Sequence, residues 1–340
     1  MTWIRRYARS IREALRGDYQ PPLPIVIMVA LLFAIVTEAF IAFNLIGADD
    51  LYNFYLPIAQ GCFDCGFTPW HTPLILWPLS LIPLRLLWTV WTILTVLGLF
   101  WASRQMEVNG LLVVFAYPAL ALVWLGQVDV IILVGLVLAL TNPNPYWRGF
   151  GLLLMSIKPQ ISGLVFLLLL FYEWYEHKEW RALIIPGAVF VLSLLIYGYD
   201  WPLRWFQERL SMFGAPGHIW SQAARFPEGL VGFLGLFFVR GKRDQATVLL
   251  LGTALSMNWF AVYSYPVFMA LFIPGFWMVP FSYSWLLLQF FGISPAIFYA
   301  GIIPLATLLA LIWPGVRQRL GWDQDAKTPR PSADASVSSR

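Results

Sequence analysis

Long apolar runs separated by short polar turns occupy most of the chain between residues 23 and 313. The first run, residues 23–45, reaches the length of about 17–25 apolar residues that crosses a bilayer. Further runs at 73–101, 111–125, 128–140, 149–157, 161–172, 183–197, 230–239 and 247–263 predict more spans, and residues 265–313 hold about three others. Backbone groups inside a bilayer must bond within their own segment, which favours helices. The pattern therefore predicts an all-α fold, a polytopic transmembrane helical bundle of about ten to twelve spans.

Three of these runs are irregular. Runs 149–157 and 230–239 are short, so flanking residues must complete them or they are not full crossings. The run at 73–101 contains Pro73, Pro78, Pro83 and Arg85, and it fits either one span or a re-entrant half-helix followed by a full helix. We count it as one crossing, because a second crossing would invert every later loop and destroy the charge asymmetry described below.

The two flanks of the apolar region differ in character. Ile4, Tyr7, Ile11 and Leu15 repeat at helical spacing among arginines, so residues 1–22 predict a cytoplasmic amphipathic helix lying on an anionic leaflet. Residues 316–340 are mostly polar and predict a disordered cytoplasmic tail. Between them lies one transmembrane domain, residues 23–315, with outer loops at 46–72 and 198–228 and with juxtamembrane helices.

Composition supports lipid as the main solvent of the side chains. The chain is 59% hydrophobic and 12% charged, against about 25% charged residues in soluble domains. Most of the 22 Lys and Arg residues fall in segments that the path places inside, which predicts a multi-pass plasma-membrane protein with both termini cytoplasmic. The exceptions are Arg85, Lys158, Arg204, Arg209 and Arg225.

Several classes of chemistry lack their sequence signals. The three His residues are scattered, and no pair has metal-ligand spacing. We find no phosphate-cradling Gly-rich loop and no G-x-S-x-G elbow. Two Cys residues in this length exclude a disulfide scaffold. We therefore expect no metal, no cofactor and no nucleic-acid partner.

The path gathers the polar residues that are hardest to explain on one side of the membrane. They lie in the first outer loop, in two tight outer turns and in the last long outer loop: Asp49, Asp50, Gln127, Asp129, Lys158, Gln160 and His218. An ionisable group at a membrane boundary between two tight spans is a functional candidate. We interpret Lys158 in this way, ahead of the alternative that it extends to the outer headgroups.

Other residues keep two interpretations. Asp49 and Asp50 also suit an ordinary hydrated loop, and Gln127 and Asp129 also suit the end of one helix and the cap of the next. Glu38, inside the first span, either lines the same cavity or bonds a neighbouring helix.

Two further features lie in the outer loops. Cys62 and Cys65 form a lone C-x-x-C that suits a small disulfide in an oxidising compartment. His71 and His218 suit interfacial positions better than acid–base roles.

Three motifs carry a resemblance to a known family. They are "GADDLYNFYLPIA" after the first span, "TPWHTPLILWPLSLIPL" before the second, and "GQVDVIILVGLVLAL" followed by "RGFGLLLMSIKPQISGLVFLLLL". As an ordered set within residues 47–170 they resemble the GT-C glycosyltransferases that use polyprenyl-phosphate sugars, and most closely the family 87 (DUF2029) mannosyltransferase-like proteins. The chain departs from that pattern at His71, where the family has Tyr, and at Asp129, where many relatives have Asn.

The resemblance implies a GT-C-like fold and an inverting hexosyltransferase on the extracytoplasmic face. The donor would be a polyprenyl-phosphate hexose, with mannose expected, and the acceptor a lipid or a cell-envelope glycan. It places the catalytic base at Asp50, with Asp49 as the alternative. Lys158, with Arg204, Arg209 or Arg225, would stabilise the leaving phosphate.

The remaining substrate-binding candidates carry weaker assignments. Gln127 and Asp129 would bond sugar hydroxyls, and Tyr52, Tyr55 or Trp70 would stack on the sugar or isoprenoid. His71, Gln160 and His218 complete the set. The rival hypotheses are a lipid or polysaccharide transporter or flippase, and a non-catalytic membrane assembly protein.

Overall fold

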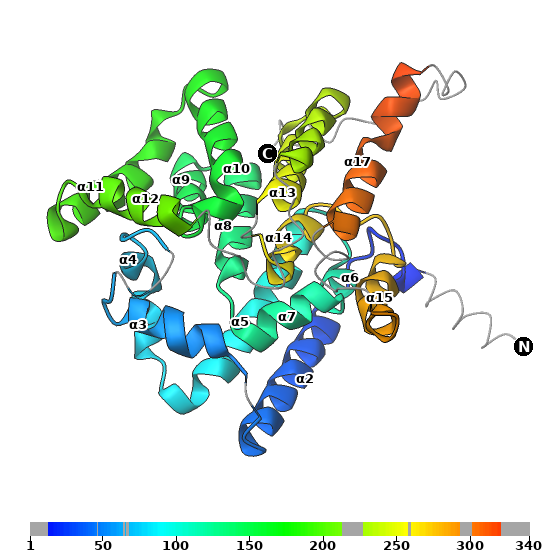
Figure 1. The fold of residues 1–340 in the computed structure, drawn as a ribbon, viewed down its shortest axis with the longest axis horizontal. Coiled ribbons are helices and arrows are strands. Elements are labelled where there is room, and N and C mark those ends of the chain that lie inside the picture. Colours follow the sequence, from blue (N-terminus) through cyan, green and yellow to red (C-terminus); the bar gives the residue numbers. More distant parts are fainter. Residues whose placement is uncertain are drawn as a thin grey trace, which may run out of the picture.

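The structure is a computed structural model of the chain, and it describes residues 13–45, 47–63, 65, 68–212, 227–257, 260–292 and 301–320. Within these ranges the regular elements are all helical, and no strand occurs (Figure 1). This confirms the all-α prediction. His218, Arg225, residues 1–12 of the predicted amphipathic helix and residues 321–340 of the predicted tail lie outside the described residues. Two predicted bounds are wrong: helical residues end at Ala14 and not at 22, and α17 (Ile303–Arg319) continues past 316, where the tail was expected to begin.

Three helices in the described ranges are long and apolar enough to cross a membrane. They are α2 (Leu23–Ala42), α5 (Leu84–Gln105) and the helix Trp180–Tyr197, which joins η4 (Trp180–Leu183) to α11 (Ile184–Tyr197). A fourth crossing exists if α7 (Tyr117–Leu125) and α8 (Asp129–Thr141), bent by 119°, form one broken span. The count of ten to twelve spans stays a prediction.

Helix α2 packs antiparallel to α5, and polar side chains of the two helices bond across the pair, one bond buried and one exposed. Thr37 Oγ1 lies 3.3 Å from Thr92 Oγ1, and Thr89 Oγ1 donates to Glu38 Oε1 at 2.5 Å. The second contact confirms one of the two interpretations of Glu38, the bond to a neighbouring helix. These hydrogen bonds give the hydroxyl groups partners that the hydrocarbon of a bilayer cannot provide.

Proline and glycine set helix boundaries that the apolar pattern did not reveal. The run at 73–101 breaks at Ile82–Pro83, so that the short α4 (Pro73–Leu76) and η2 (Trp77–Leu81) precede α5. This matches the alternative of a short piece followed by a full helix, and the predicted start of the span at Pro73 is wrong. The run at 111–125 also breaks, into α6 (Gly110–Val114) and α7, ahead of Pro118.

The remaining elements are shorter. They are η1 (Leu51–Tyr55), α3 (Leu56–Ala59), α9 (Pro145–Met155), α10 (Pro159–Phe171), η3 (Tyr172–Glu176), α12 (Trp201–Met212), η5 (Glu228–Phe238), α13 (Lys242–Ser256), η6 (Val262–Ser264), α14 (Pro266–Met269), α15 (Met278–Phe290) and α17 (Ile303–Arg319). The predicted span at 247–263 ends early, because α13 stops at Ser256.

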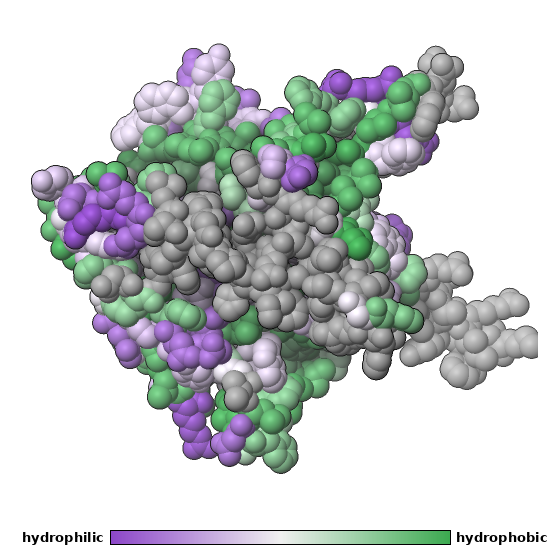
Figure 2. All heavy atoms as spheres, viewed as in Figure 1, coloured by the Kyte–Doolittle hydropathy of each residue, from purple (hydrophilic) through white to green (hydrophobic). Residues whose placement is uncertain are grey.

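Large apolar side chains cover the outward faces of the long helices. Ile35 of α2 is 67% exposed and Leu195 of α11 is 79% exposed. Figure 2 shows hydrophobic residues over much of the visible described surface, with hydrophilic ones in separate patches. Soluble monomers rarely expose contiguous apolar patches above a few hundred Å². The exposed apolar helices therefore describe a membrane-embedded protein.

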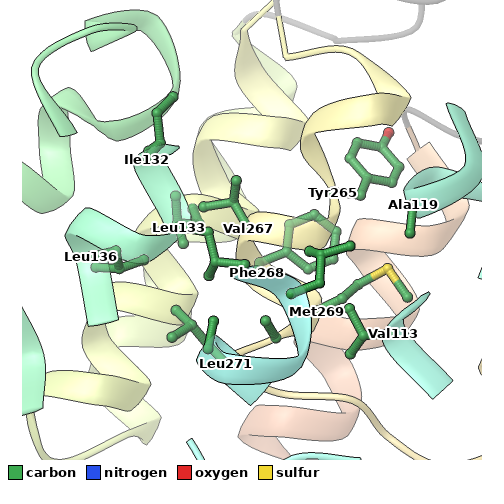
Figure 3. Close-up of a cluster of buried hydrophobic side chains, with 14 of the residues drawn as sticks. Val113, Ala119, Ile132, Leu133, Leu136, Tyr265, Val267, Phe268, Met269 and Leu271 are labelled. Carbon is green, nitrogen blue, oxygen red and sulfur yellow. The ribbon is translucent and has the colours of Figure 1, made fainter. Parts of the chain in front are cut away.

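A dense core forms where η6 and α14 insert beside α7 and α8. Tyr265 and Phe268 are fully buried there, with ring centroids 5.1 Å apart, and Leu133 of α8 packs in the same cluster (Figure 3). This packing fixes η6 and α14. It also holds the residues just before α14 against the polar site described below.

Two contacts join segments that the sequence places inside. Asn109, after α5, donates from its backbone N–H to Gly17 O at 2.7 Å. Arg148 and Glu173 form a largely buried ion pair at 2.7 Å. Each contact therefore joins two predicted inner segments, and the assignment of these segments to the cytoplasm stays a prediction.

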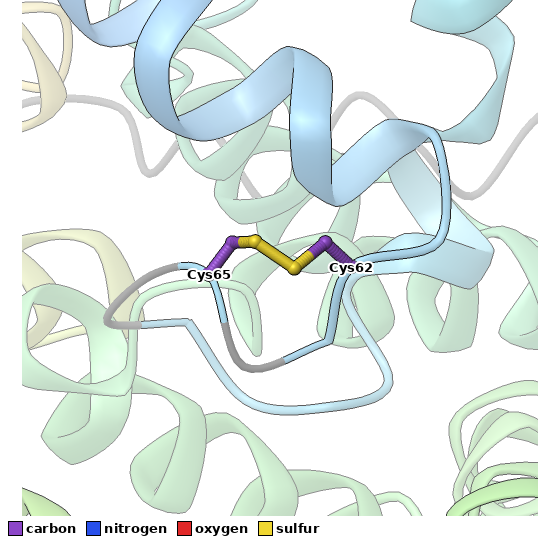
Figure 4. Close-up of a disulfide and its surroundings, with 2 residues drawn as sticks. All are labelled: Cys62 and Cys65. Carbon is purple, nitrogen blue, oxygen red and sulfur yellow. A yellow bond between two sulfur atoms is a disulfide. The ribbon is translucent and has the colours of Figure 1, made fainter.

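Cys62 and Cys65 form a disulfide, with Cα atoms 5.5 Å apart (Figure 4). The predicted small disulfide is confirmed. Between the two cysteines, Phe63 packs on Trp70 and Tyr197, with ring centroids 4.7 and 5.0 Å away. The first predicted outer loop therefore packs against the last residue of α11, next to the predicted outer loop 198–228.

Candidate functional site

The first predicted outer loop lies directly on the turn between α7 and α8. Ala48 N donates to Trp124 O at 2.6 Å. Gly126 ends α7 with φ +67°, and a Cβ at this position would lie 2.5 Å from Leu51 Cβ. A side chain there would meet both a backbone penalty and a clash. Gly126 thus allows the polar neighbours of the two sequence motifs to meet.

Gln127 is the centre of the resulting network. Its Oε1 accepts hydrogen bonds from Tyr55 Oη at 2.7 Å and from Lys158 Nζ at 2.6 Å. Two donors on the oxygen fix the orientation of the amide, so Nε2 faces and donates to Asp50 Oδ2. From α5, Trp91 Nε1 donates to the backbone carbonyl of Gln127 at 3.1 Å.

Lys158 occupies the N-cap of α10, directly before Pro159. Its side chain is buried, 7% exposed, and Nζ lies 3.1 Å from Asp129 Oδ2. The ammonium also lies 5.4 Å from the ring centroids of both Tyr55 and Tyr263. A paired, enclosed lysine does not reach for headgroups, so the alternative interpretation of Lys158 as an interfacial lysine is wrong.

The capping interpretation is confirmed at the end of α7, where Gln127 N donates to Leu122 O at 3.1 Å, and is wrong at the start of α8. The N-cap residue of α8 is Val128, which makes no side-chain cap bond. Gln127 instead bonds across three segments, and Asp129, in the first turn of α8, pairs with Lys158. A carboxylate at a helix N-terminus also interacts favourably with the helix dipole.

Asp50 is the partly open end of this network. Burial raises the pKa of the Asp50 carboxyl; Lys158 opposes the rise, whereas Asp49 adds to it. Asp49 is exposed, and its Oδ1 accepts a bond from Asn53 Nδ2 at 2.6 Å. Of the two predicted bases, Asp50 therefore belongs to the network, and Asp49 lies beside it in solvent.

The other predicted substrate residues lie outside the network. Tyr52 Oη donates to Leu84 O at 3.3 Å. His71 Nε2 lies 2.7 Å from Ser156 Oγ. Gln160 is half-buried in the first turn of α10.

Of the predicted phosphate-binding arginines, the structure describes the side chain of Arg204, which bonds elsewhere than to Lys158. Arg204 forms an ion pair with Asp200 at 3.0 Å, and its guanidinium lies 4.6 Å from the ring centroid of Trp70. The side chain of Arg209 lies outside the described residues, as do Arg225 and His218.

One network member was missed from the sequence. Tyr263 forms part of the wall around Lys158, yet no pattern around it separates it from the core aromatics. Tyr55 was found, but as a stacking residue, whereas the structure gives its hydroxyl a hydrogen bond. Tyr55 and Tyr263 both lie on short helices. Sequence periodicity does not determine the direction in which side chains of such short helices point.

Within the described residues, no group of three His, Cys, Asp or Glu side chains is placed to hold a metal ion. Comparison of the chain with protein-family models, with curated proteins and with solved structures found no match.

Proposed function

We propose that this protein is a membrane glycosyltransferase with a GT-C-like architecture, which transfers a hexose, with mannose expected, from a polyprenyl-phosphate donor to a lipid or cell-envelope glycan. The reaction takes place on the non-cytoplasmic face, with Asp50 as the base. The observation that carries the proposal is the hydrogen-bonded chain Asp50–Gln127–Lys158–Asp129, which joins three predicted outer segments.

The chemistry of the reaction suits this arrangement. Asp50 accepts the proton of the acceptor hydroxyl as the oxygen bonds to the anomeric carbon. The bond from that carbon to the phosphate oxygen breaks, and the electron pair leaves with the polyprenyl phosphate. A single displacement of this kind inverts the anomeric centre.

Lys158 has a different role from the one that the resemblance implies. Its charge is paired with Asp129 in a buried setting, and separating such a pair is costly. Lys158 therefore acts as a positioning residue: it holds Gln127 Oε1, so that Gln127 Nε2 orients the Asp50 carboxylate.

The test is direct transfer by the purified full chain. Proteoliposomes made with bacterial polar lipids are given polyprenyl-phosphate [³H]mannose, or the glucose or galactose analogue. The amount of label that leaves the donor is then measured. With one of the three donors, we expect the labelled hexose to leave the donor and to appear in a new product. No transfer with any of the three donors would overturn the proposal.

A second candidate, a transporter or flippase, is favoured by one observation. A buried Asp129–Lys158 pair lies at a 119° bend between apolar helices, and transporters place ionisable groups at broken helices. The same proteoliposomes separate the two functions. A transporter would move intact donor across the bilayer without releasing the sugar.

A further inference from the structure

An exposed apolar row on η5 ends at a basic residue. Val231, Leu234 and Phe237 of η5 are between 52% and 66% exposed. Side chains three residues apart in a 3₁₀ helix lie on the same face, so these three form one row on the outside of the protein. Arg240 follows three residues later, just beyond the end of η5, and is also exposed. An apolar row that ends in a cation matches the two parts of a phospholipid.

Helix α17 brings a second guanidinium to the same end of η5. A Cβ at Gly315 would overlap Phe238 O, so this glycine allows α17 to pack directly on the end of η5. Arg319, in the last turn of α17, donates from Nη2 to Phe237 O. Its guanidinium carbon lies 5.3 Å from the ring centroid of Phe238. The partners of Arg319 are therefore the residues two and three positions before Arg240.

The charges of these two arginines have no carboxylate partner within the described ranges. Arg240 forms no ion pair there, and Arg319 contacts a neutral carbonyl and an aromatic ring. Three arginines of other predicted inner segments each pair with a carboxylate. These pairs are Arg16–Asp18, Arg148–Glu173 and Arg181–Glu179. The end of η5 thus carries two positive charges that no acidic side chain of the described chain neutralises.

We propose that Arg240 and Arg319 bind the phosphate of an anionic phospholipid, whose acyl chain lies along the exposed row of η5. Arginine binds phosphate through two parallel N–H···O bonds. Basic sites between the helices of membrane proteins bind anionic headgroups in this way. A zwitterionic phospholipid fits less well, because its ammonium group would lie near the same two cations.

This site is separate from the proposed sugar transfer. Arg240 and Arg319 fall in predicted inner segments, whereas Asp50 and its network belong to predicted outer ones. Neither arginine takes part in the proposed chemistry. Lipid binding is measured without turnover, so it stands or falls independently of the proposed function.

The test is native mass spectrometry of the purified full chain. The protein is released from micelles that contain equal amounts of phosphatidylglycerol and phosphatidylcholine with the same acyl chains. We expect phosphatidylglycerol adducts to exceed phosphatidylcholine adducts about thirtyfold, which corresponds to about 1 kcal/mol for each of two basic residues near a membrane surface. Equal binding of the two lipids would overturn the proposal.

Arg240→Gln tests the headgroup contact most cleanly, because the side chain is exposed and forms no ion pair within the described ranges. The preference for phosphatidylglycerol should fall about fivefold. Arg319→Gln should lower the preference by a similar factor, with its thermal unfolding profile as a check that the contact with η5 is not needed for folding. A wild-type preference in Arg240→Gln would refute the proposed site.

Arg181→Gln is the matched control for the charge. Arg181 also lies in a predicted inner segment and is exposed, but it pairs with Glu179 at 3.8 Å. This substitution removes the same charge from the protein, and the wild-type preference should persist. Equal falls in Arg181→Gln and Arg240→Gln would show an effect of net charge and contradict a specific site.

A water-soluble competitor tests the acyl-chain contact. Glycerophosphoglycerol has the headgroup of phosphatidylglycerol without its acyl chains. Added to the micelles at the same concentration as the lipid, it should leave the phosphatidylglycerol adducts unchanged, because it lacks the apolar contact with η5. Displacement of the lipid by this compound would indicate a site for soluble phosphates and contradict the proposal.

Discussion

Asp50→Asn is expected to lower sugar transfer by about 10²- to 10⁴-fold, the usual contribution of a positioned general base. Asparagine has nearly the same shape and still accepts a bond from Gln127 Nε2 through its carbonyl oxygen, so the fold should persist. It cannot take the proton of the acceptor hydroxyl. Transfer rates of the purified variant, with its thermal unfolding profile as a check of folding, give the measurement.

Asp49→Asn is the matched control for this substitution. Asp49 precedes Asp50, is exposed and lies outside the Gln127 network, so its variant should keep nearly all activity. Equal loss in both variants would point to the charge of the loop and not to a specific base. Full activity of Asp50→Asn would remove the proposed mechanism.

The pH profile of wild-type transfer carries the same information. Only the ionised Asp50 accepts a proton, and its pKa lies above the ordinary aspartate value because of burial. The rate should therefore fall on the acidic side as pH drops through this raised pKa, and this decline should be absent from the residual rate of Asp50→Asn.

The second large effect concerns stability. Lys158→Met should destabilise the protein by about 3–5 kcal/mol, because it leaves Asp129 as a buried charge without its partner. The double variant Lys158→Met with Asp129→Leu removes both charges and should recover most of this loss. Thermal unfolding of each variant in the same detergent measures the differences.

A neighbouring position supplies the control for this pair. Gln160 lies two residues after Lys158 in α10 and outside the network, so Gln160→Met should change the unfolding temperature little. A double variant as unstable as Lys158→Met alone would contradict the ion-pair account. A stable Lys158→Met variant would do the same.

The sequence predicted the members of the network better than their connections. Asp50, Gln127 and Lys158 interrupt apolar runs at predicted outer turns. Polar and ionisable groups at such positions are functional candidates. Composition alone could not show that Lys158 pairs with Asp129, because a lysine at a membrane boundary fits a headgroup equally well.

Helix boundaries were predicted least well, for a physical reason. Side chains that face lipid and side chains that face the core are equally apolar, so hydropathy runs through a break such as Ile82–Pro83 without a change. Tyr263 was missed for a related reason, since it reaches Lys158 through a short helix that periodicity does not define.

The central claim is that the Asp50 network opens on the non-cytoplasmic face. Gln127 and Lys158 are too buried to report this by labelling, with 2% and 5% exposure, whereas Asp49 is exposed beside the network. In a background with Cys62→Ser and Cys65→Ser, Asp49→Cys in intact cells should react with a membrane-impermeant maleimide. Arg104→Cys, at the predicted cytoplasmic end of α5, should react only after lysis. Labelling of Asp49→Cys only after lysis would place the network inside the cell and contradict the account.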